Sequence, residues 1–217
     1  DIARMIPAGM PWDLTPDPDD PDAQTLSLTY PTAFNQSLAY LRQIVKIEFG
    51  ARSDTEPAET IQVQSYLAKA FPELFRESRF PVHTVSPRRT FWEKAMLLHE
   101  ETFRPAKSQR KARLARHYYD LYQLIRAGVG RDAAGDLDLF HRIAAHRRVY
   151  FRHNWVDYET LTPGRLILAP PDDQLAIWRA DYTAMGEEMI FTRPPEFDEL
   201  IETIRKFQER FNAAHPR

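Results

Sequence analysis

Lys46 and Glu48 lie two residues apart in the apolar stretch IVKIEFG. Side chains alternate along a strand, so Val45, Ile47 and Phe49 are expected to face the core while Lys46 and Glu48 share the opposite face. A Glu carboxylate on a sheet face suits Mg²⁺ and phosphate transfer when other carboxylates lie nearby. The alternative is a solvent-facing ion pair, worth less than about 1 kcal/mol.

Lys94, Arg116 and Asp120 are the other candidates for chemistry. Lys94 borders the apolar face of a predicted helix. There it either extends its ammonium group into water or holds it at the mouth of a pocket for a triphosphate. In the next predicted helix, Arg116 and Asp120 lie four residues apart, opposite the core-facing stripe. That spacing is equally typical of a surface ion pair, so both interpretations stay open.

Basic residues gather in the segment 104–117, RPAKSQRKARLARH, which holds six Lys or Arg and no acid. Such a run is usually a solvated loop, but it is also the strongest footprint for phosphate in the chain. Nearby aromatic residues such as Trp155 either stack on bases or pack in the core. A second basic group follows: Arg142, Arg147, Arg148 and Arg152.

The elements that must position these residues divide into a β-rich part, 25–85, and a helical part, 86–217, which gives an α+β fold class. Residues 1–24 have the Asp- and Pro-rich composition of a flexible acidic segment, where we expect no structure. Ser86 followed by Pro87 is typical of a helix N-terminus. Periodicity predicts strands at 25–31, 43–49, 59–65, 80–85 and 165–169, a helical turn at 32–42, a short helix at 65–75 interrupted by Pro72, and helices at 86–103, 112–127, 136–148, 173–188 and 195–213.

Composition and short motifs limit which classes of protein and which kinds of site are possible. The 217 residues are 43% hydrophobic, carry a formal net charge of −2 and contain no cysteine, which excludes disulfides and thiolate metal sites. No apolar run approaches the ~18 residues of a membrane-spanning helix, so we expect a cytoplasmic protein with no membrane attachment. His141 and His146 are five residues apart, which is poor spacing for zinc on one helical face. The sequence holds no P-loop and no dinucleotide-binding glycine motif.

Four segments together resemble the AbiEii/AbiGii-type abortive-infection toxins, which are nucleotidyltransferase-fold proteins of bacterial toxin–antitoxin systems. The resemblance extends from residue 25 to residue 213. It implies a nucleotidyltransferase-like mixed sheet followed by a helical bundle, and a role in phage defence. The segments are YLRQIVKIEFGARSDTEP (40–57), SPRRTFWEKAMLLHEE (86–101), RHYYDLYQL (116–124) and ADYTAMGEEMI (180–190).

The resemblance also implies roles for the charged residues. Glu48 corresponds to the third carboxylate of the family's metal site, Lys94 to a phosphate-contacting lysine and Asp120 to the acidic residue of the last motif. Arg116 and Lys46 add flanking positive charge. The implied cofactor is Mg²⁺ and the implied substrate an NTP. The implied partners are a cognate antitoxin and an RNA acceptor, such as tRNA, bound through 104–117.

One element of the family pattern is not found. The Gly-Ser turn with its Asp-x-Asp pair has no match, because Asp17-Pro18-Asp19 contains a proline and Asp136-Leu137-Asp138 opens a helix downstream of the other motifs. We expect this element upstream of Asp1, so that the sheet and the metal site of this chain are partial. The remaining site requires Glu48, Lys94 and Asp120 to converge on one cleft.

Two other interpretations stay open. One is a Mg²⁺-dependent nuclease, although Lys46-x-Glu48 reverses the usual Glu-x-Lys order. The other is a non-catalytic module that binds RNA or an antitoxin through residues 104–117.

Overall fold

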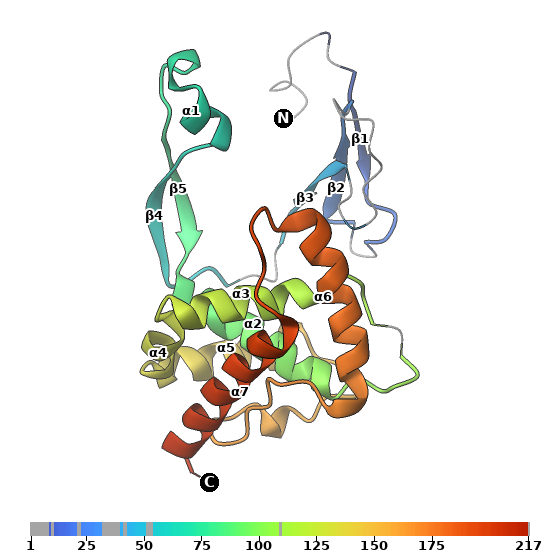
Figure 1. Cartoon of the computed structure of the whole chain (residues 1–217), viewed down its shortest axis with the longest axis vertical. Coiled ribbons are helices and arrows are strands. Elements are labelled where there is room, and N and C mark those ends of the chain that lie inside the picture. The colour runs from blue at the N-terminus through green and yellow to red at the C-terminus, as the bar shows by residue number, and fades with distance from the viewer. Residues whose placement is uncertain are drawn as a thin grey trace. The chain divides into compact units, whose positions relative to one another are not determined.

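The structure is a computed structural model that describes residues 9, 11–20, 23–31, 40, 43–50, 54–108 and 110–216. It has an α+β fold of helices and small antiparallel sheets (Figure 1). The chain divides into two compact units. Unit 1 takes residues 1–53 together with Thr183–Pro194, and unit 2 takes Asp54–Tyr182 together with Pro195–Arg217. This grouping differs from the boundary expected at residue 85, because the hairpin before that residue belongs with the helices.

Unit 1 contains a three-stranded antiparallel sheet in the order β1-β2-β3. Strands β2 and β3 confirm the predictions at 25–31 and 43–49. Strand β1 lies inside the acidic segment where no structure was expected. The strands are β1 (Asp13–Pro16), β2 (Thr25–Thr29) and β3 (Ile44–Glu48).

The apolar face of this sheet is less buried than its alternation suggested. Val45 and Phe49 are 44% and 54% exposed, so the expectation that they lie in a core is wrong. Leu28, opposite Val45 in the register, is only half-buried. Alternation therefore identified which residues share a face but not whether that face is covered. The helical turn expected at 32–42 falls almost wholly outside the described residues.

Unit 2 begins with an antiparallel hairpin of β4 (Ala58–Val63) and β5 (Phe80–Val85). Between the strands lie α1 (Tyr66–Ala70) and the short turn η2 (Pro72–Leu74). We call residues 58–85 the arm; it extends from the N-terminal end of α2 (Figure 1). Every strand pair among the described residues is antiparallel, so the expected mixed sheet is not observed there.

Most helices of unit 2 begin within three residues of their predicted starts. Ser86 accepts a hydrogen bond from the Arg89 amide (3.3 Å) and Asp136 from the Leu139 amide (3.1 Å), as N-cap residues do. Helix α4 was not predicted. The helices are α2 (Pro87–Thr102), α3 (Ala115–Arg126), α4 (Val129–Ala134), α5 (Leu137–Tyr150), α6 (Leu175–Met189), which continues into unit 1, and α7 (Phe197–Ala214), with single turns η3 (Tyr158–Thr160) and η4 (Asp172–Gln174).

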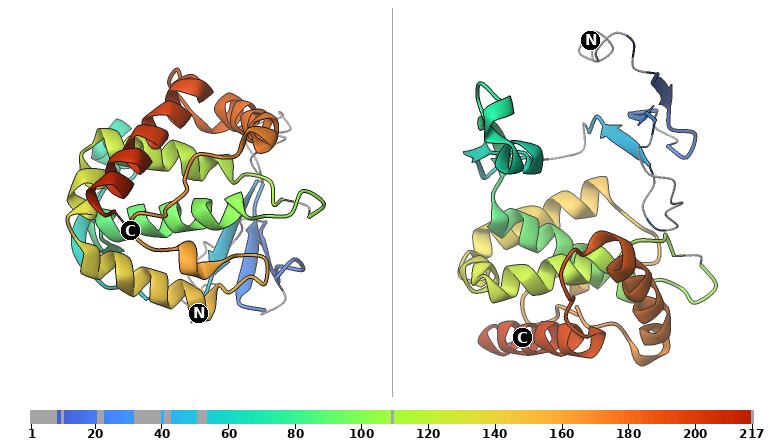
Figure 2. Two further views of the ribbon diagram at one scale, coloured as in Figure 1. Left: turned by 90° about the horizontal axis from the view of Figure 1, so that it is seen from below. Right: turned by 45° about the horizontal axis from the view of Figure 1, so that its top comes forward.

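Helix α2 is central to the helical part of unit 2, where it contacts α3, α4 and α5, while α7 packs against α3 (Figure 2). Its predicted core face is confirmed, since Phe91 and Trp92 are fully buried. The Trp92 ring meets Phe140 edge-on and its Nε1 donates to the Ala133 carbonyl. A Cβ at Gly130 of α4 would lie 3.1 Å from the Phe91 ring, so a larger residue there would require its neighbours to shift by a few tenths of an ångström.

The apolar segment 165–169 is not a strand, contrary to the prediction. Its backbone groups are paired with side chains from α2, α3 and α7 rather than with another strand. Because buried peptide groups must be paired, these side chains replace a sheet partner. The bonds join Asn212 to both backbone groups of Leu166, Gln208 to the amides of Leu168 and Ala169, Tyr118 to the Leu168 carbonyl, and His99 to the Ile167 amide.

The hydrogen bond between His99 and Ile167 makes the stability of the segment 165–169 depend on pH. The Nδ1 of His99 accepts from the Ile167 amide (3.0 Å), so in the neutral ring Nε2 carries the proton toward Thr160 Oγ1 (3.0 Å). Burial lowers the pKa of His99 to about 4. The unfolded chain, with a histidine pKa of about 6.5, binds more protons between pH 4 and 6.5, so acidification through this window favours unfolding.

We therefore predict that lowering the pH from 7 to 5 costs about 2 kcal/mol of folding free energy through His99 alone. Urea unfolding at both pH values would measure it. A His99→Gln variant should be less stable at pH 7 but should lose less on acidification. His83→Gln, on the exposed surface of β5, is the matched control. An equal pH dependence in wild type and His99→Gln would contradict the assignment.

Candidate functional site

Two of the candidate residues meet in unit 2. Lys94 Nζ on α2 lies 2.7 Å from Asp120 Oδ2 on α3. The Lys94 side chain is 23% exposed and that of Asp120 is 40% exposed, so the pair stays accessible. Arg116 is exposed on the first turn of α3. The structure thus pairs Asp120 with a different helix, not with Arg116 as the i,i+4 spacing suggested.

His117 adjoins this pair and was not singled out from the sequence. Its Nδ1 is buried and has no hydrogen-bond partner in the described part of the chain. Burial, followed by the charges of Lys94 and Arg116, lowers the pKa of His117 to about 4. The ring is therefore neutral at pH 7. The position of His117 in RHYYD, one helical turn before Asp120, is the sequence signal that could have identified it.

The N-terminus of α3, which carries Arg116, is held by a residue distant in sequence. The N-cap residue Leu114 supplies no side-chain hydrogen bond. Instead, Asp181 of α6 accepts from the amides of Ala115 (2.7 Å) and Arg113 (2.9 Å). A carboxylate is favourable at the positive end of the helix dipole. Arg113 has a left-handed backbone (φ +70°), which these bonds hold in place.

The basic segment 104–117 is partly neutralised inside the protein. Arg104 bonds to Glu101 at 2.6 and 2.7 Å, and Arg110 does so at 3.2 Å. Burial opposes the charged carboxylate, but hydrogen bonds from Arg104 and Arg110 hold the pKa of Glu101 below its usual value. Both guanidinium groups also lie over tryptophan rings, Arg104 over Trp155 and Arg110 over Trp178. Trp155 therefore already packs against Arg104 within the protein.

The second basic group is also partly structural. Arg147 makes a buried bidentate pair with Glu100 of α2, at 2.6 and 2.7 Å. Arg148 donates to the Tyr158 carbonyl (2.8 Å). The cations of the two groups that are exposed are Lys107, Lys111, Arg116, Arg142 and Arg152.

In unit 1 the candidates Lys46 and Glu48 form an ion pair with each other. Lys46 Nζ lies 3.2 Å from Glu48 Oε1 and 3.3 Å from Asp17 Oδ2. Partial burial opposes the charge, but hydrogen bonds to Glu48 and Asp17 raise the pKa of Lys46. Asp17, set aside in the sequence as part of a loop, follows directly after β1 and is 5% exposed. Glu48 is exposed, with 68% of its side chain accessible.

These carboxylates do not by themselves form a magnesium site. Asp17 and Glu48 both direct an oxygen at the Lys46 ammonium, whereas Mg²⁺ needs near-octahedral oxygen ligands. Among the residues that the structure describes, no group of three or more His, Asp or Glu side chains is placed to hold a metal ion. His141 and His146 are therefore not part of a zinc site within those residues.

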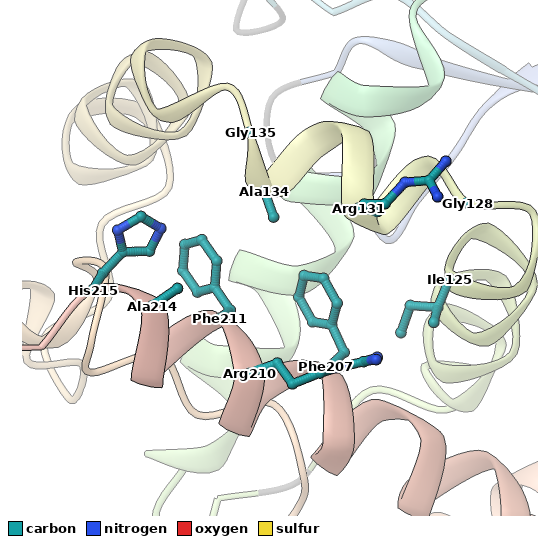
Figure 3. A pocket seen from close by; sticks show the side chains of 10 residues that line it. All are labelled: Ile125, Gly128, Arg131, Ala134, Gly135, Phe207, Arg210, Phe211, Ala214 and His215. Carbon is teal, nitrogen blue, oxygen red and sulfur yellow. The ribbon is translucent and has the colours of Figure 1, made fainter.

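A cavity in unit 2 lies away from Lys94 and Asp120. It has a volume of 520 Å³ and lies between the C-terminal end of α3, helix α4 and the C-terminal half of α7 (Figure 3). Phe207 and Phe211 form its apolar wall, with Arg131 and Arg210 beside them. None of its lining residues is acidic.

No helix in the described ranges combines the length and the apolar character needed to cross a bilayer.

Comparison with known proteins identifies one family. The family model described as "Nucleotidyl transferase AbiEii toxin, Type IV TA system" matches residues 9–203 of the 217. This span includes Lys46, Glu48, Lys94, Arg116 and Asp120. No curated protein and no solved structure matches the chain.

We predict that the Lys94–Asp120 pair contributes little to stability. Partly exposed ion pairs are worth about 0.2–1 kcal/mol, so a double-mutant cycle of Lys94→Ala and Asp120→Ala should give a coupling energy in that range. Chemical unfolding of the four proteins would measure it. The Arg179–Asp198 pair, 2.6 Å apart and more exposed, is the control. A coupling above about 2 kcal/mol would mark the pair as structural.

Removal of the Asp181 carboxylate should loosen the start of α3. We predict that Asp181→Ala lowers the free energy of unfolding by about 1–2 kcal/mol, as loss of an N-cap does. Asp181→Asn keeps one acceptor oxygen and should lose less. Hydrogen exchange of the Arg113 and Ala115 amides should rise in Asp181→Ala more than elsewhere in α3. Unchanged exchange at these two amides would contradict the capping role.

Proposed function

The chain belongs to the AbiEii family of nucleotidyl transferase toxins of type IV toxin–antitoxin systems, and from this premise we propose a specific reaction. The protein transfers a nucleoside monophosphate from an NTP to an RNA acceptor, such as tRNA. The observation that carries the proposal is the Lys94–Asp120 pair at 2.7 Å, accessible and flanked by the exposed Arg116.

The bonds change as follows. A hydroxyl oxygen of the acceptor bonds to the α-phosphorus of the NTP, the bond from that phosphorus to the β-bridging oxygen breaks, and pyrophosphate leaves with the electron pair. The hydroxyl proton passes to a base, the role of Asp120. Lys94, released from Asp120 when the triphosphate binds, donates to phosphate oxygens, and Arg116 adds a second donor. Such positioned cations offset the charge that develops on the leaving group.

Unit 1 has a separate role in the proposal. Glu48 is the third carboxylate of the family's metal site by its place in VKIE, and Lys46 is flanking charge. Because the described carboxylates do not assemble a Mg²⁺ site, no step of the proposal is routed through the metal, and each step is assigned to a side chain of α2 or α3. Glu48 therefore enters the experiment as a variant to be tested separately.

The RNA contact is proposed for the cations that the fold leaves exposed. Arg104 and Arg110 are engaged with Glu101, so the interface within 104–117 narrows to Lys107, Lys111 and Arg116. Three exposed cations support a salt-dependent association through phosphate groups. They carry no information about sequence, so acceptor choice must come from the shape of the RNA.

As a member of a toxin–antitoxin family, the protein has an antitoxin counterpart, and we propose that it acts in phage defence inside the cytoplasm. The antitoxin then opposes the modification of RNA.

The reaction is tested with end-labelled tRNA, the four NTPs and MgCl₂. We predict strand lengthening by wild type. Lys94→Ala should reduce kcat/KM for the NTP about tenfold to a hundredfold, since a hydrogen bond to a charged group is worth about 1.5–3 kcal/mol. Lys94→Arg should recover part of the loss. Lys206→Ala on α7, an exposed lysine paired with Glu202, is the matched control.

The same gel separates the competing interpretations. Strand shortening that Glu48→Gln abolishes would indicate a nuclease instead. Binding of tRNA without any change in its length, unaffected by Glu48→Ala and lost at high salt, would indicate a non-catalytic module. Transfer at the wild-type rate by the Lys94→Ala variant would exclude the proposed site.

A further inference from the structure

His117 places an imidazole ring beside the Lys94–Asp120 pair. It lies three residues before Asp120 on α3, and residues three apart on a helix are neighbours on its surface. Lys94 of α2 reaches Asp120 at 2.7 Å, and the charges of both residues act on the ring. All three residues belong to unit 2. The imidazole is therefore part of the same cluster, although the proposed reaction gives it no role.

The two ring nitrogens of His117 differ in their surroundings. Nδ1 is buried, and no group in the described part of the chain makes a hydrogen bond to it. Nε2 is not among the buried unpaired atoms, and the residue as a whole is only half-buried. Nε2 is therefore the nitrogen on the accessible side of the ring.

The burial of Nδ1 decides which nitrogen carries the proton. A neutral imidazole has one N–H donor and one acceptor. Buried N–H groups without an acceptor are rarer in proteins than buried acceptors with an unused lone pair, which places the proton on Nε2. The accessible nitrogen of His117 is then a hydrogen-bond donor. Protonation of the ring would put an unpaired N–H at the buried Nδ1, so the same argument favours the neutral form.

The charges around the ring also favour a neutral donor at this position. The charges that act on it most strongly are those of Lys94 of α2, Arg116 and Asp120 of α3, and Arg147 of α5. Three of the four are cations, and a further cation among them would be repelled. A neutral N–H adds a hydrogen bond for an anion without adding to this repulsion.

We propose that His117 is a third donor to the triphosphate, whose Nε2–H bonds to a non-bridging oxygen of the NTP that Lys94 and Arg116 also bind. The inference rests on the proposed nucleotidyl transfer for the identity of the ligand. Hydrogen bonds to an ionised acceptor are stronger than those between neutral groups, so the contact adds to the affinity for the NTP. The imidazole keeps its proton throughout, and proton transfer stays with Asp120.

Binding of the four α,β-methylene NTP analogues to the full chain, measured by calorimetry with MgCl₂, tests the contact without the transfer reaction. His117→Leu removes the donor and should weaken binding of the preferred analogue about tenfold to a hundredfold. His117→Gln places an amide N–H close to the position of Nε2 and should recover most of the affinity. His215→Leu, at a half-buried histidine directly after α7, is the matched control. Urea unfolding would establish that each variant folds.

The pH dependence of binding tests the charge of the donor. The ratio of the dissociation constants of His117→Leu and wild type should be the same at pH 6.5 and pH 8, because a neutral ring does not titrate between them. A ratio that falls as the pH rises would indicate an imidazolium contact and would overturn the neutral donor.

Failure of this contact can be told apart from failure of the proposed reaction. Weaker binding by Lys94→Ala, together with wild-type binding by His117→Leu, would overturn the contact alone. A loss in His117→Leu that His117→Gln does not restore would mean that the ring only packs. A wild-type chain that binds none of the analogues would overturn both proposals. Binding that depends on His117, without lengthening of tRNA, would support the contact and count against the transfer.

Discussion

Unit 2 depends on pairing the charged side chains of its central helix. Helix α2 packs against three other helices, yet it carries ionisable side chains that burial would make costly if they were alone. Each therefore has a partner from another element. Arg89 bonds to Asp54 at the base of the arm, Lys94 to Asp120 of α3, Glu100 to Arg147 of α5, and Glu101 to Arg104 and Arg110 of the following loop. These pairs fix the position of each neighbouring element along α2. The apolar face of α2 supplies most of its buried surface.

The pairs differ in solvent exposure. This difference distinguishes the pairs that stabilise the fold from the pair that we propose for ligand binding. Arg89 is fully buried, and only 3% of the Glu100 side chain is accessible. Removal of one partner would leave an uncompensated charge in the interior, which is strongly destabilising. Lys94 keeps 23% of its side chain accessible and Asp120 keeps 40%. Both can exchange partners with a ligand at little cost to the fold, which is why we propose this pair for contact with a triphosphate.

Local signals in the sequence predicted the helices and strands well, and long-range pairings could not be predicted. Ser86-Pro87 and Asp136 set the starts of α2 and α5 because an N-cap acts within one turn. Strand β1 was missed because Asp and Pro dominate its surroundings and Leu14 is its only large apolar residue. The segment 165–169 has the composition of a strand, but its peptide groups pair with side chains such as Asn212 and Gln208, far along the chain. Lys94 and Asp120 were each predicted as candidates; their contact, like the Asp181 cap on α3, required the structure.

The same pairings decide which cations of the two basic groups remain exposed. The sequence shows six basic residues in 104–117 with no acid among them, which overstates the surface charge, because Glu101 lies just before the segment and binds Arg104 and Arg110. Similarly, Arg147 is balanced by Glu100 in the interior. What remains exposed at the start of α3 is Arg116, close in sequence to Asp120 and on a turn that Asp181 holds in place. We propose that phosphate recognition is concentrated at this first turn of α3, where Arg116 is exposed and Asp181 fixes the backbone.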